Sequence, residues 1–184
     1  MFIQTETTPN PSTLKFLPGR PVLAEGAREF RTREAASAAS PLAGALLSID
    51  GVEAVMFGPD FVSVTKTEAE WAHLKPAILG TIMEHFSSGQ PIVIDNAEAA
   101  PAEFFDPADA DTVAQIKELI VTRVRPAVAN DGGDITFRGF RDGIVYVAMK
   151  GSCSGCPSST ATLKNGIENM LRHFVPQVAS VQQV

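Results

Sequence analysis

Two cysteines with a spacing suited to metal or redox chemistry lie near the carboxyl end of the chain. Cys153 and Cys156 are its only cysteines, and they stand in the sequence Gly151-Ser152-Cys153-Ser154-Gly155-Cys156. The two intervening residues bring the sulfur atoms close enough to bind one metal centre, and the glycines let the backbone turn without steric cost. The pattern therefore predicts a metal or redox site in this loop.

We expect both cysteines to be present as thiolates. The sequence Pro157-Ser158-Ser159-Thr160 predicts the start of a helix directly after the loop. Free backbone amides and the positive end of the helix dipole stabilise negative charge at such a position. Metal binding by cysteine requires the thiolate, so this position suits a ligand.

The spacing of the two cysteines alone favours none of three kinds of site over the others: an iron–sulfur cluster, a redox dithiol and a zinc site. No aromatic residue precedes the motif and the strand–helix order differs from that of thioredoxin, which disfavours the dithiol. The chain contains no second Cys-x-x-Cys and no His-x-x-x-His, which disfavours zinc bound within one chain. Zinc shared between two chains stays open.

The number of ligands bears on the iron–sulfur interpretation. Common clusters take four cysteine ligands, and this chain has two. A complete ligand set then requires a second chain, and the simplest arrangement is a two-fold homodimer whose loops face each other. A [4Fe–4S] cluster at such an interface would have all four irons coordinated, and it would lie between subunits that can separate.

The residues around the cysteines predict a small mixed unit. An apolar stripe indicates a helix from about Asp109, with a kink beyond Pro126 and an end at the glycines of 130–133. Two strands, 135–140 and 144–149, flank Arg141-Asp142-Gly143, which favours a hairpin. A helix follows the cysteine loop, and 178–184 adds a possible last strand. The expected order is α-β-β-α(-β).

The amino-terminal part of the chain predicts a second mixed unit, which lacks cysteine. Strands are expected at 1–7 and 13–17, and Ser40-Pro41 predicts a helix start with an end before Gly51. Strands at 52–57 and 61–66 form a predicted hairpin. Leu74, Ile78, Ile82 and Phe86 recur at helical spacing, which places a helix at about 68–86.

We therefore predict an α+β protein of two small domains, 1–94 and 107–184, joined by an acidic flexible linker at 95–106. The linker is rich in alanine, proline and acidic residues, which bury little apolar surface. Residues 1–106 contain 14 acidic and 7 basic side chains, whereas 107–184 contain 7 and 8. This charge asymmetry also indicates two units.

Charge and hydropathy exclude some classes of function. The net charge of −6 opposes binding to nucleic acid. The sequence contains no apolar run long enough to cross a membrane and no secretory signal pattern. We expect a soluble intracellular protein, cytoplasmic in a bacterium or in the mitochondrial matrix if it is a processed organellar form.

Several motifs together resemble the NifU-like (Nfu) iron–sulfur proteins. Arg125-Pro126, Asp131-Gly132-Gly133-Asp134 and the stretch from Gly151 to Pro157 resemble the carboxyl-terminal domain of that family over about 109–184. The opening Met1-Phe2-Ile3-Gln4-Thr5-Glu6 and Thr8-Pro9-Asn10-Pro11-Ser12 are similar to its amino-terminal domain. The resemblance covers almost the whole chain.

The resemblance implies a cluster scaffold and carrier rather than an enzyme. Such a protein accepts a [4Fe–4S] cluster from upstream assembly proteins and passes it to apo-proteins, with Cys153 and Cys156 as ligands. It implies partner recognition or tuning of transfer for the amino-terminal domain. A thiol–disulfide oxidoreductase is the alternative function.

Other polar residues are given structural roles. We expect His73, His85 and His173 to be surface or core residues of helices rather than ligands. Asp131 and Asp134 flank glycines and are interpreted as turn and cap residues, and the alternative is that they support the cluster loop without being ligands.

Overall fold

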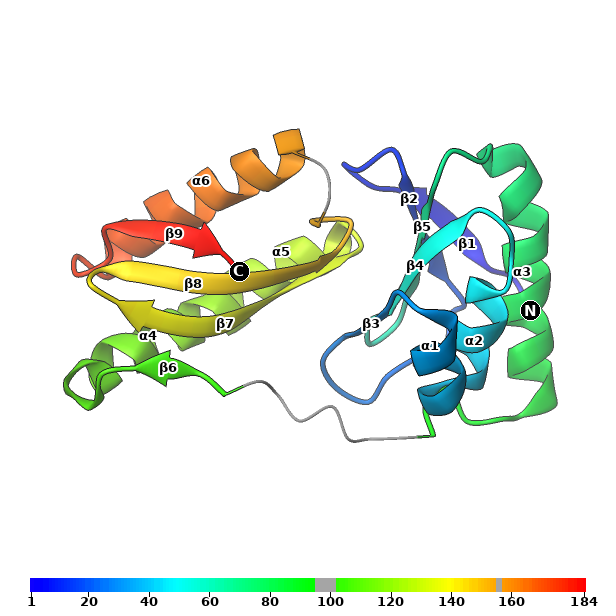
Figure 1. Cartoon of the computed structure of the whole chain (residues 1–184), viewed down its shortest axis with the longest axis horizontal. Coiled ribbons are helices and arrows are strands. Elements are labelled where there is room, and N and C mark those ends of the chain that lie inside the picture. The colour runs from blue at the N-terminus through cyan, green and yellow to red at the C-terminus, as the bar shows by residue number, and fades with distance from the viewer. Residues whose placement is uncertain (95–101, 155–156) are drawn as a thin grey trace. The chain divides into compact units, whose positions relative to one another are not determined.

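The chain folds into two compact units, Met1–Glu98 and Ala99–Val184, each with its own sheet and helices. The computed structural model describes residues 1–94, 102–154 and 157–184, and it describes only the backbone of 157–159 (Figure 1). Both units mix helices and strands, so the predicted α+β fold class is confirmed. Residues 95–101 of the predicted linker lie outside the described residues.

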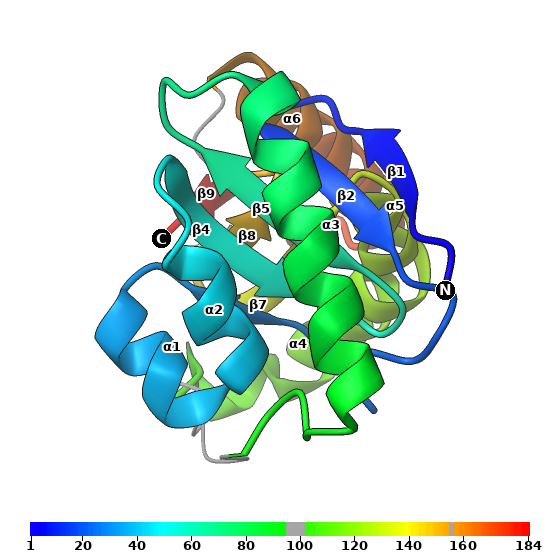
Figure 2. The same ribbon diagram turned by 90° about the vertical axis from the view of Figure 1, so that its right-hand side faces the viewer.

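The first unit is an antiparallel five-stranded sheet with helices on one face. Its strand order is β1-β2-β5-β4-β3. Figure 2 shows α2 and α3 lying across the same face of this sheet. The strands are β1 (Gln4–Thr7), β2 (Thr13–Leu17), β3 (Arg28–Phe30), β4 (Val52–Phe57) and β5 (Val62–Lys66), and the helices are α1 (Arg33–Ala39), α2 (Pro41–Leu47) and α3 (Trp71–Ser88).

Local signals in the sequence explain several of these elements. The Ser40 side chain caps α2 by accepting a hydrogen bond of 3.1 Å from the Ala43 amide, and Pro41 occupies the first turn. The β4–β5 hairpin is closed by a hydrogen bond from the Gly58 amide to the Phe61 carbonyl. The predicted helix start and hairpin are confirmed.

The second unit is a four-stranded sheet of order β6-β7-β8-β9 backed by helices. The central pair β7 and β8 is antiparallel, whereas β6 and β9 join the edges as parallel strands. The elements are β6 (Phe104–Phe105), the 3-10 helix η1 (Pro107–Asp109), α4 (Ala110–Leu119), the π-helix η2 (Ile120–Val124), α5 (Arg125–Asn130), β7 (Gly133–Arg141), β8 (Ile144–Gly151), α6 (Pro157–Phe174) and β9 (Ser180–Gln183).

The core of the second unit fills the space between the sheet and its helices. Apolar side chains from α4, η2 and α5 meet those from the strands and from α6. The fully buried members are Ile116, Ile135, Val145, Val147, Leu171 and Val181. Cys153 belongs to the same buried cluster.

A kink was predicted beyond Pro126, but the irregular turn of this helix, η2, lies just before the proline. Proline has no amide hydrogen, and its ring clashes with the carbonyl four residues earlier in a regular helix. The backbone widens into η2, and the Arg125 amide donates to the Ile120 carbonyl five residues back. The helix then continues as α5 to Asn130, so Pro126 does not end it.

The β7–β8 hairpin determines where the cysteine loop begins. Asp142 and Gly143 both have positive φ angles, 52° and 77°, as the Asp-Gly turn predicted. The register that this turn starts places Gly133 opposite Gly151 at the far end of the hairpin. The first residue of β7 therefore lies beside the start of the cysteine loop.

The end of the predicted linker is part of the second sheet. Phe104 and Phe105 pair in parallel with Gly139 and Phe140 of β7. The Phe104 ring also packs against Tyr146, with the ring centroids 5.2 Å apart. Residues 104 and 105, which the sequence assigned to the linker, therefore form an edge strand of the second sheet, and Asp106 caps η1.

Candidate functional site

The cysteine loop joins β8 to α6, and Cys153 is buried within it. The Cys153 side chain is 6% exposed and packs in the core cluster of the second unit. Cys156, the second predicted ligand, lies outside the described residues. The structure thus positions one of the two predicted site residues.

Gly133 provides the space that the Cys153 sulfur occupies. A Cβ atom built on Gly133 would lie 2.5 Å from Cys153 Sγ and 3.0 Å from the Lys150 carbonyl oxygen. Contacts this short are not tolerated between a methyl group and a sulfur or backbone oxygen. A glycine at this position is therefore required for the observed packing of Cys153.

Ser152 ties the loop to the segment before β7. Its hydroxyl donates to the Asp131 carbonyl, and its amide donates to the Gly132 carbonyl at 3.3 Å. The same hydroxyl lies 3.9 Å from Cys153 Sγ. The turn between α5 and β7 therefore holds the residue next to the cysteine.

The loop is also held from its other side. The Ser154 amide and hydroxyl both donate to the Gly151 carbonyl, at 3.0 and 2.9 Å. In α6, the Thr160 hydroxyl donates to the Cys153 carbonyl at 2.9 Å. These bonds fix the backbone of Gly151–Ser154 through both neighbouring elements.

An ion pair braces the segment on which the loop rests. Arg125 donates to the two carboxylate oxygens of Asp134 from Nε and Nη2, at 2.9 and 3.1 Å. The Asp134 side chain is 7% exposed, whereas that of Arg125 is 32% exposed. Asp134 thus lies in β7 and pairs with α5, so its interpretation as a turn or cap residue is wrong. The sequence holds no signal that these residues, nine positions apart, meet.

Burial raises the pKa of the Cys153 thiol to about 11. The hydrogen bond with Ser152 acts in the opposite direction, and the negative charges of Asp131 and Asp134 raise the pKa further. The thiolate expected from the sequence is therefore wrong for Cys153 in the metal-free protein. The sulfur lies in the core, where loss of hydration outweighs the stabilisation expected at the helix start.

The described residues do not assemble a complete metal site within one chain. No group of three or more histidine, cysteine or acidic side chains lies close enough to hold a metal ion among residues 1–94, 102–154 and 157–184. Over the same ranges, no helix is long and apolar enough to cross a membrane. The site built by this part of the chain is one buried thiol on a braced loop.

The fold and site define a two-unit α+β protein with its cysteine pair between the last long strand and the last helix. Two family models match the chain: "Scaffold protein Nfu/NifU N terminal" over residues 3–89 and "NifU-like domain" over 116–182. The chain belongs to the Nfu/NifU family of scaffold proteins.

Curated relatives match along the whole chain. The human NFU1 iron-sulfur cluster scaffold homolog, mitochondrial, is 52% identical over 100% of this chain and 72% of its own length. The NifU-like protein 4, mitochondrial, of Arabidopsis thaliana is 53% identical over 100% of this chain and 66% of its own length. A solution structure of a NifU-like protein from Saccharomyces cerevisiae is 28% identical, with a TM-score of 0.47, over 52% of this chain and 87% of that one.

Proposed function

We propose that the chain is an iron–sulfur cluster scaffold and carrier without enzymatic turnover of its own. It binds a [4Fe–4S] cluster at the interface of a homodimer, through Cys153 and Cys156 of each copy. It receives the cluster from upstream assembly proteins and transfers it to apo-proteins. The cluster is cargo rather than a permanent cofactor.

The number of cysteines in a chain of this family carries the proposal. Relatives that match the whole chain are named as iron–sulfur cluster scaffolds. A cluster of the common type takes four cysteine ligands, and this chain has two cysteines. Two copies supply the full set, and a two-fold axis is the simplest relation between them.

The structure of the loop is compatible with this cargo. Cys153 stands on a backbone held from both sides, which suits a defined ligand position. Coordination to a metal removes the thiol proton, so a high pKa in the metal-free protein does not prevent ligation. Because Cys153 Sγ is buried beside Gly133, we expect cluster binding to turn the Cys153 side chain out of the core while the hydrogen bonds on both sides hold the loop backbone.

The pKa of Cys153 argues against the oxidoreductase alternative. Thiols that attack disulfides have lowered pKa values, because the thiolate is the nucleophile. Burial instead raises the pKa of Cys153 to about 11, so almost all of this thiol is protonated near neutral pH. This environment is poor for rapid thiol–disulfide exchange.

The first unit and the cellular location complete the proposal. The first unit has no cysteine, so its role is recognition of partners or tuning of transfer. The human and Arabidopsis thaliana relatives are named as mitochondrial proteins, which supports the organellar form over a bacterial cytoplasmic one.

Anaerobic reconstitution tests the proposal. The full chain, reduced and supplied with ferrous iron and sulfide, should become brown and dimeric with about four irons and four sulfides per dimer. Cys153→Ser and Cys156→Ser should each stay folded, as judged by circular dichroism, and lose stable cluster binding, because either change removes two of four ligands.

Ser154→Ala is the matched control. It disturbs the same loop, by removing the hydroxyl bond to Gly151, but it removes no sulfur. It should retain the cluster and transfer it to an apo-acceptor. A colourless monomer that reduces disulfides with turnover would favour the oxidoreductase, and a full cluster in either cysteine variant would overturn the shared site.

A further inference from the structure

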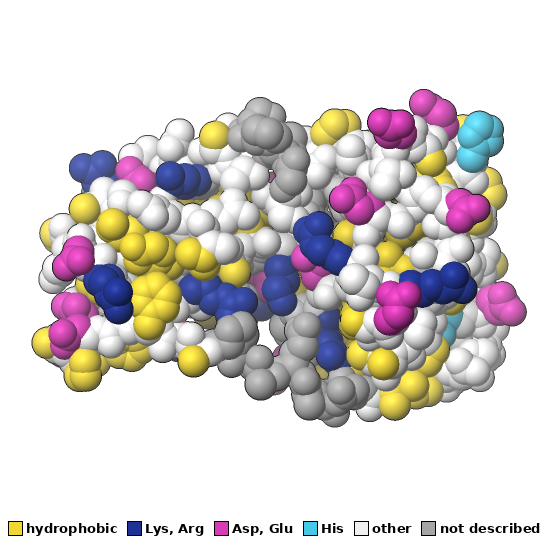
Figure 3. All heavy atoms as spheres, in the orientation of Figure 1, with side chains coloured by type: hydrophobic (Ala, Val, Ile, Leu, Met, Phe, Trp, Pro, Cys, Tyr) yellow, Lys and Arg dark blue, Asp and Glu magenta, His cyan; other side chains and the backbone are white. Residues whose placement is uncertain are grey.

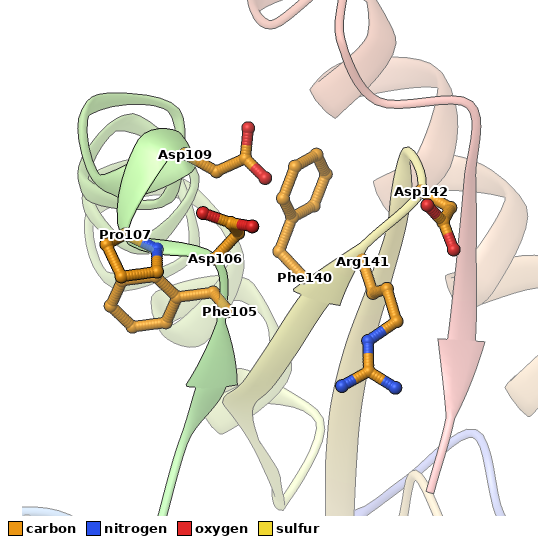
Figure 4. A pocket seen from close by; sticks show the side chains of 7 residues that line it. All are labelled: Phe105, Asp106, Pro107, Asp109, Phe140, Arg141 and Asp142. Atoms are coloured by element: carbon orange, nitrogen blue, oxygen red, sulfur yellow. The ribbon is translucent and has the colours of Figure 1, made fainter.

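A pocket of about 400 Å³ lies at the end of the second unit that carries the β7–β8 turn (Figure 4). The cysteine loop follows the opposite end of the hairpin, where Gly133 pairs with Gly151. Because β7 has nine residues and a strand rises about 3.3 Å per residue, roughly 26 Å separate the two ends. The pocket is therefore distinct from the cysteine site.

Part of the pocket lining is apolar. It consists of Phe105 of β6, Pro107 of η1 and Phe140 of β7, and Figure 4 shows the Phe140 ring apart from Phe105 and Pro107. Phe105 is 39% exposed and its neighbour Phe104 is 37% exposed, so apolar surface remains open to solvent here. In Figure 3, hydrophobic and acidic side chains lie side by side at this end of the second unit.

The other lining residues are mostly acidic. Asp106, Asp109 and Asp142 contribute carboxylates, and those of Asp106 and Asp109 point towards the Phe140 ring in Figure 4. Asp106 accepts a hydrogen bond of 2.9 Å from the Ala108 amide. Within the described part of the chain, the Asp109 and Asp142 carboxylates have neither a hydrogen bond nor an ion pair. They are therefore available to a ligand.

The lining residues include one cation, Arg141, which does not neutralise this group. Its guanidinium lies 5.5 Å from the centre of the Phe104 ring. In Figure 4 it points away from the Asp106 and Asp109 carboxylates. The pocket thus combines three carboxylates with aromatic surface and retains a net negative charge.

We propose that this pocket binds an arginine side chain from a segment of a partner protein. A guanidinium is planar, stacks on aromatic rings and donates to a carboxylate through two parallel hydrogen bonds. Phe105 provides exposed aromatic surface, and Asp109 provides an unpaired carboxylate. The hydrocarbon part of the arginine side chain covers Pro107.

The position of β6 indicates how the segment carrying the arginine binds. β6 is an edge strand, so its outer side offers backbone groups to an extended segment. Such a segment places alternate side chains on the two faces of the sheet. This site does not depend on the proposed cluster function, and it lies at the opposite end of the β7–β8 hairpin from the cysteine loop.

Nuclear magnetic resonance titration of the full isotope-labelled chain tests the proposal. The probe is the capped peptide Ala-Val-Arg-Val-Ala, with neutral citrulline or lysine in place of arginine as comparison peptides. The arginine peptide should shift the amide signals of Phe105, Gly139 and Phe140, and high salt should weaken its binding. The citrulline peptide should not bind, and the lysine peptide should bind more weakly.

Two substitutions at the pocket and one control identify the carboxylates. Asp109→Asn with Asp142→Asn should weaken the arginine peptide about threefold to thirtyfold, the range for two exposed ion pairs. Asparagine tolerates the positive φ of Asp142, so the turn is kept. Asp111→Asn makes the same charge change on exposed surface of α4, outside the pocket, and should have no effect.

Three results would overturn the proposal. The first is an equal loss of affinity in Asp111→Asn and in the double variant, which would indicate general attraction to an acidic protein. The second is a set of amide signal shifts, on addition of the arginine peptide, that is confined to residues outside the pocket. The third is equal binding of the citrulline or lysine peptide, which would exclude recognition of a guanidinium.

Discussion

Substitution of Gly133 by alanine tests the packing of Cys153 directly. The new methyl group would lie 2.5 Å from Cys153 Sγ and 3.0 Å from the Lys150 carbonyl oxygen. The φ angle of Gly133 is not positive, so the cost is steric rather than conformational. Overpacking of this kind costs about 1–3 kcal/mol, which lowers the melting temperature of a unit of this size by roughly 4–24 °C.

The chain offers separate optical signals for its two units. Tyr146 is the single tyrosine and lies in the second unit, whereas Trp71 is the single tryptophan and lies in the first. Thermal unfolding of the metal-free, reduced protein should show an earlier Tyr146 transition in Gly133→Ala, with the Trp71 transition unchanged. Gly166→Ala is the control, because its added Cβ meets nothing within 4 Å and helical alanine gains about 0.5–1 kcal/mol over glycine.

A double-mutant cycle then identifies the sulfur as the source of the cost. In a Cys153→Ala background the closest clash is absent, and the contact with the Lys150 carbonyl remains. The destabilisation by Gly133→Ala should fall by about 1 kcal/mol or more in that background. If Gly133→Ala costs the same with and without the Cys153 sulfur, or costs nothing, the proposed packing is wrong.

Three further predictions concern Cys153, His85 and Asp134. In metal-free Cys156→Ser protein, the rate of Cys153 alkylation by iodoacetamide should increase about tenfold per pH unit towards pH 10, because burial raises the pKa of the thiol to about 11. A rate that reaches a plateau below about pH 9 would contradict this. Burial lowers the pKa of His85, so the unfolded chain binds a proton at a higher pH than the folded chain does. The free energy of unfolding of the first unit should therefore decrease as pH falls through about 6.5. His85→Gln should reduce this pH dependence in urea titrations followed by Trp71 fluorescence. Asp134→Asn should destabilise the second unit by about 1–3 kcal/mol in unfolding followed by Tyr146, since it breaks a bidentate ion pair, whereas exposed Asp111→Asn should stay within about 0.5 kcal/mol.

Elements with strong local signals could be predicted from the sequence. The Asp142-Gly143 turn fixes the β7–β8 hairpin, and the Ser40 cap starts α2, because both depend on residues adjacent in the chain. The long helix α3 follows from its apolar spacing. The position of the cysteine loop between a strand and a helix follows from the same kind of information.

Other elements depend on contacts between distant residues and were missed. The short strand β3, at Arg28–Phe30, is defined by pairing with β4, and α1 is an alanine-rich helix with one buried residue and no apolar stripe. The prediction that Cys153 is a thiolate was wrong for a related reason. Proximity to a helix start can be read from the sequence, whereas burial in the core requires the fold.

Two glycines of β7, Gly133 and Gly139, connect the fold to both proposed sites. From the sequence alone, a glycine within a strand predicts a locally less stable sheet, since glycine loses more backbone entropy on folding and has no side chain to pack. In the structure, the space beside Gly133 is filled by the Cys153 sulfur, and the space beside Gly139 is filled by the Phe104 ring. The first contact positions the proposed cluster ligand, and the second holds β6, which carries Phe105 into the wall of the acidic pocket. The absence of a side chain at each glycine is therefore explained by a side chain from outside β7 that occupies the space. Only folding brings these side chains next to the glycines.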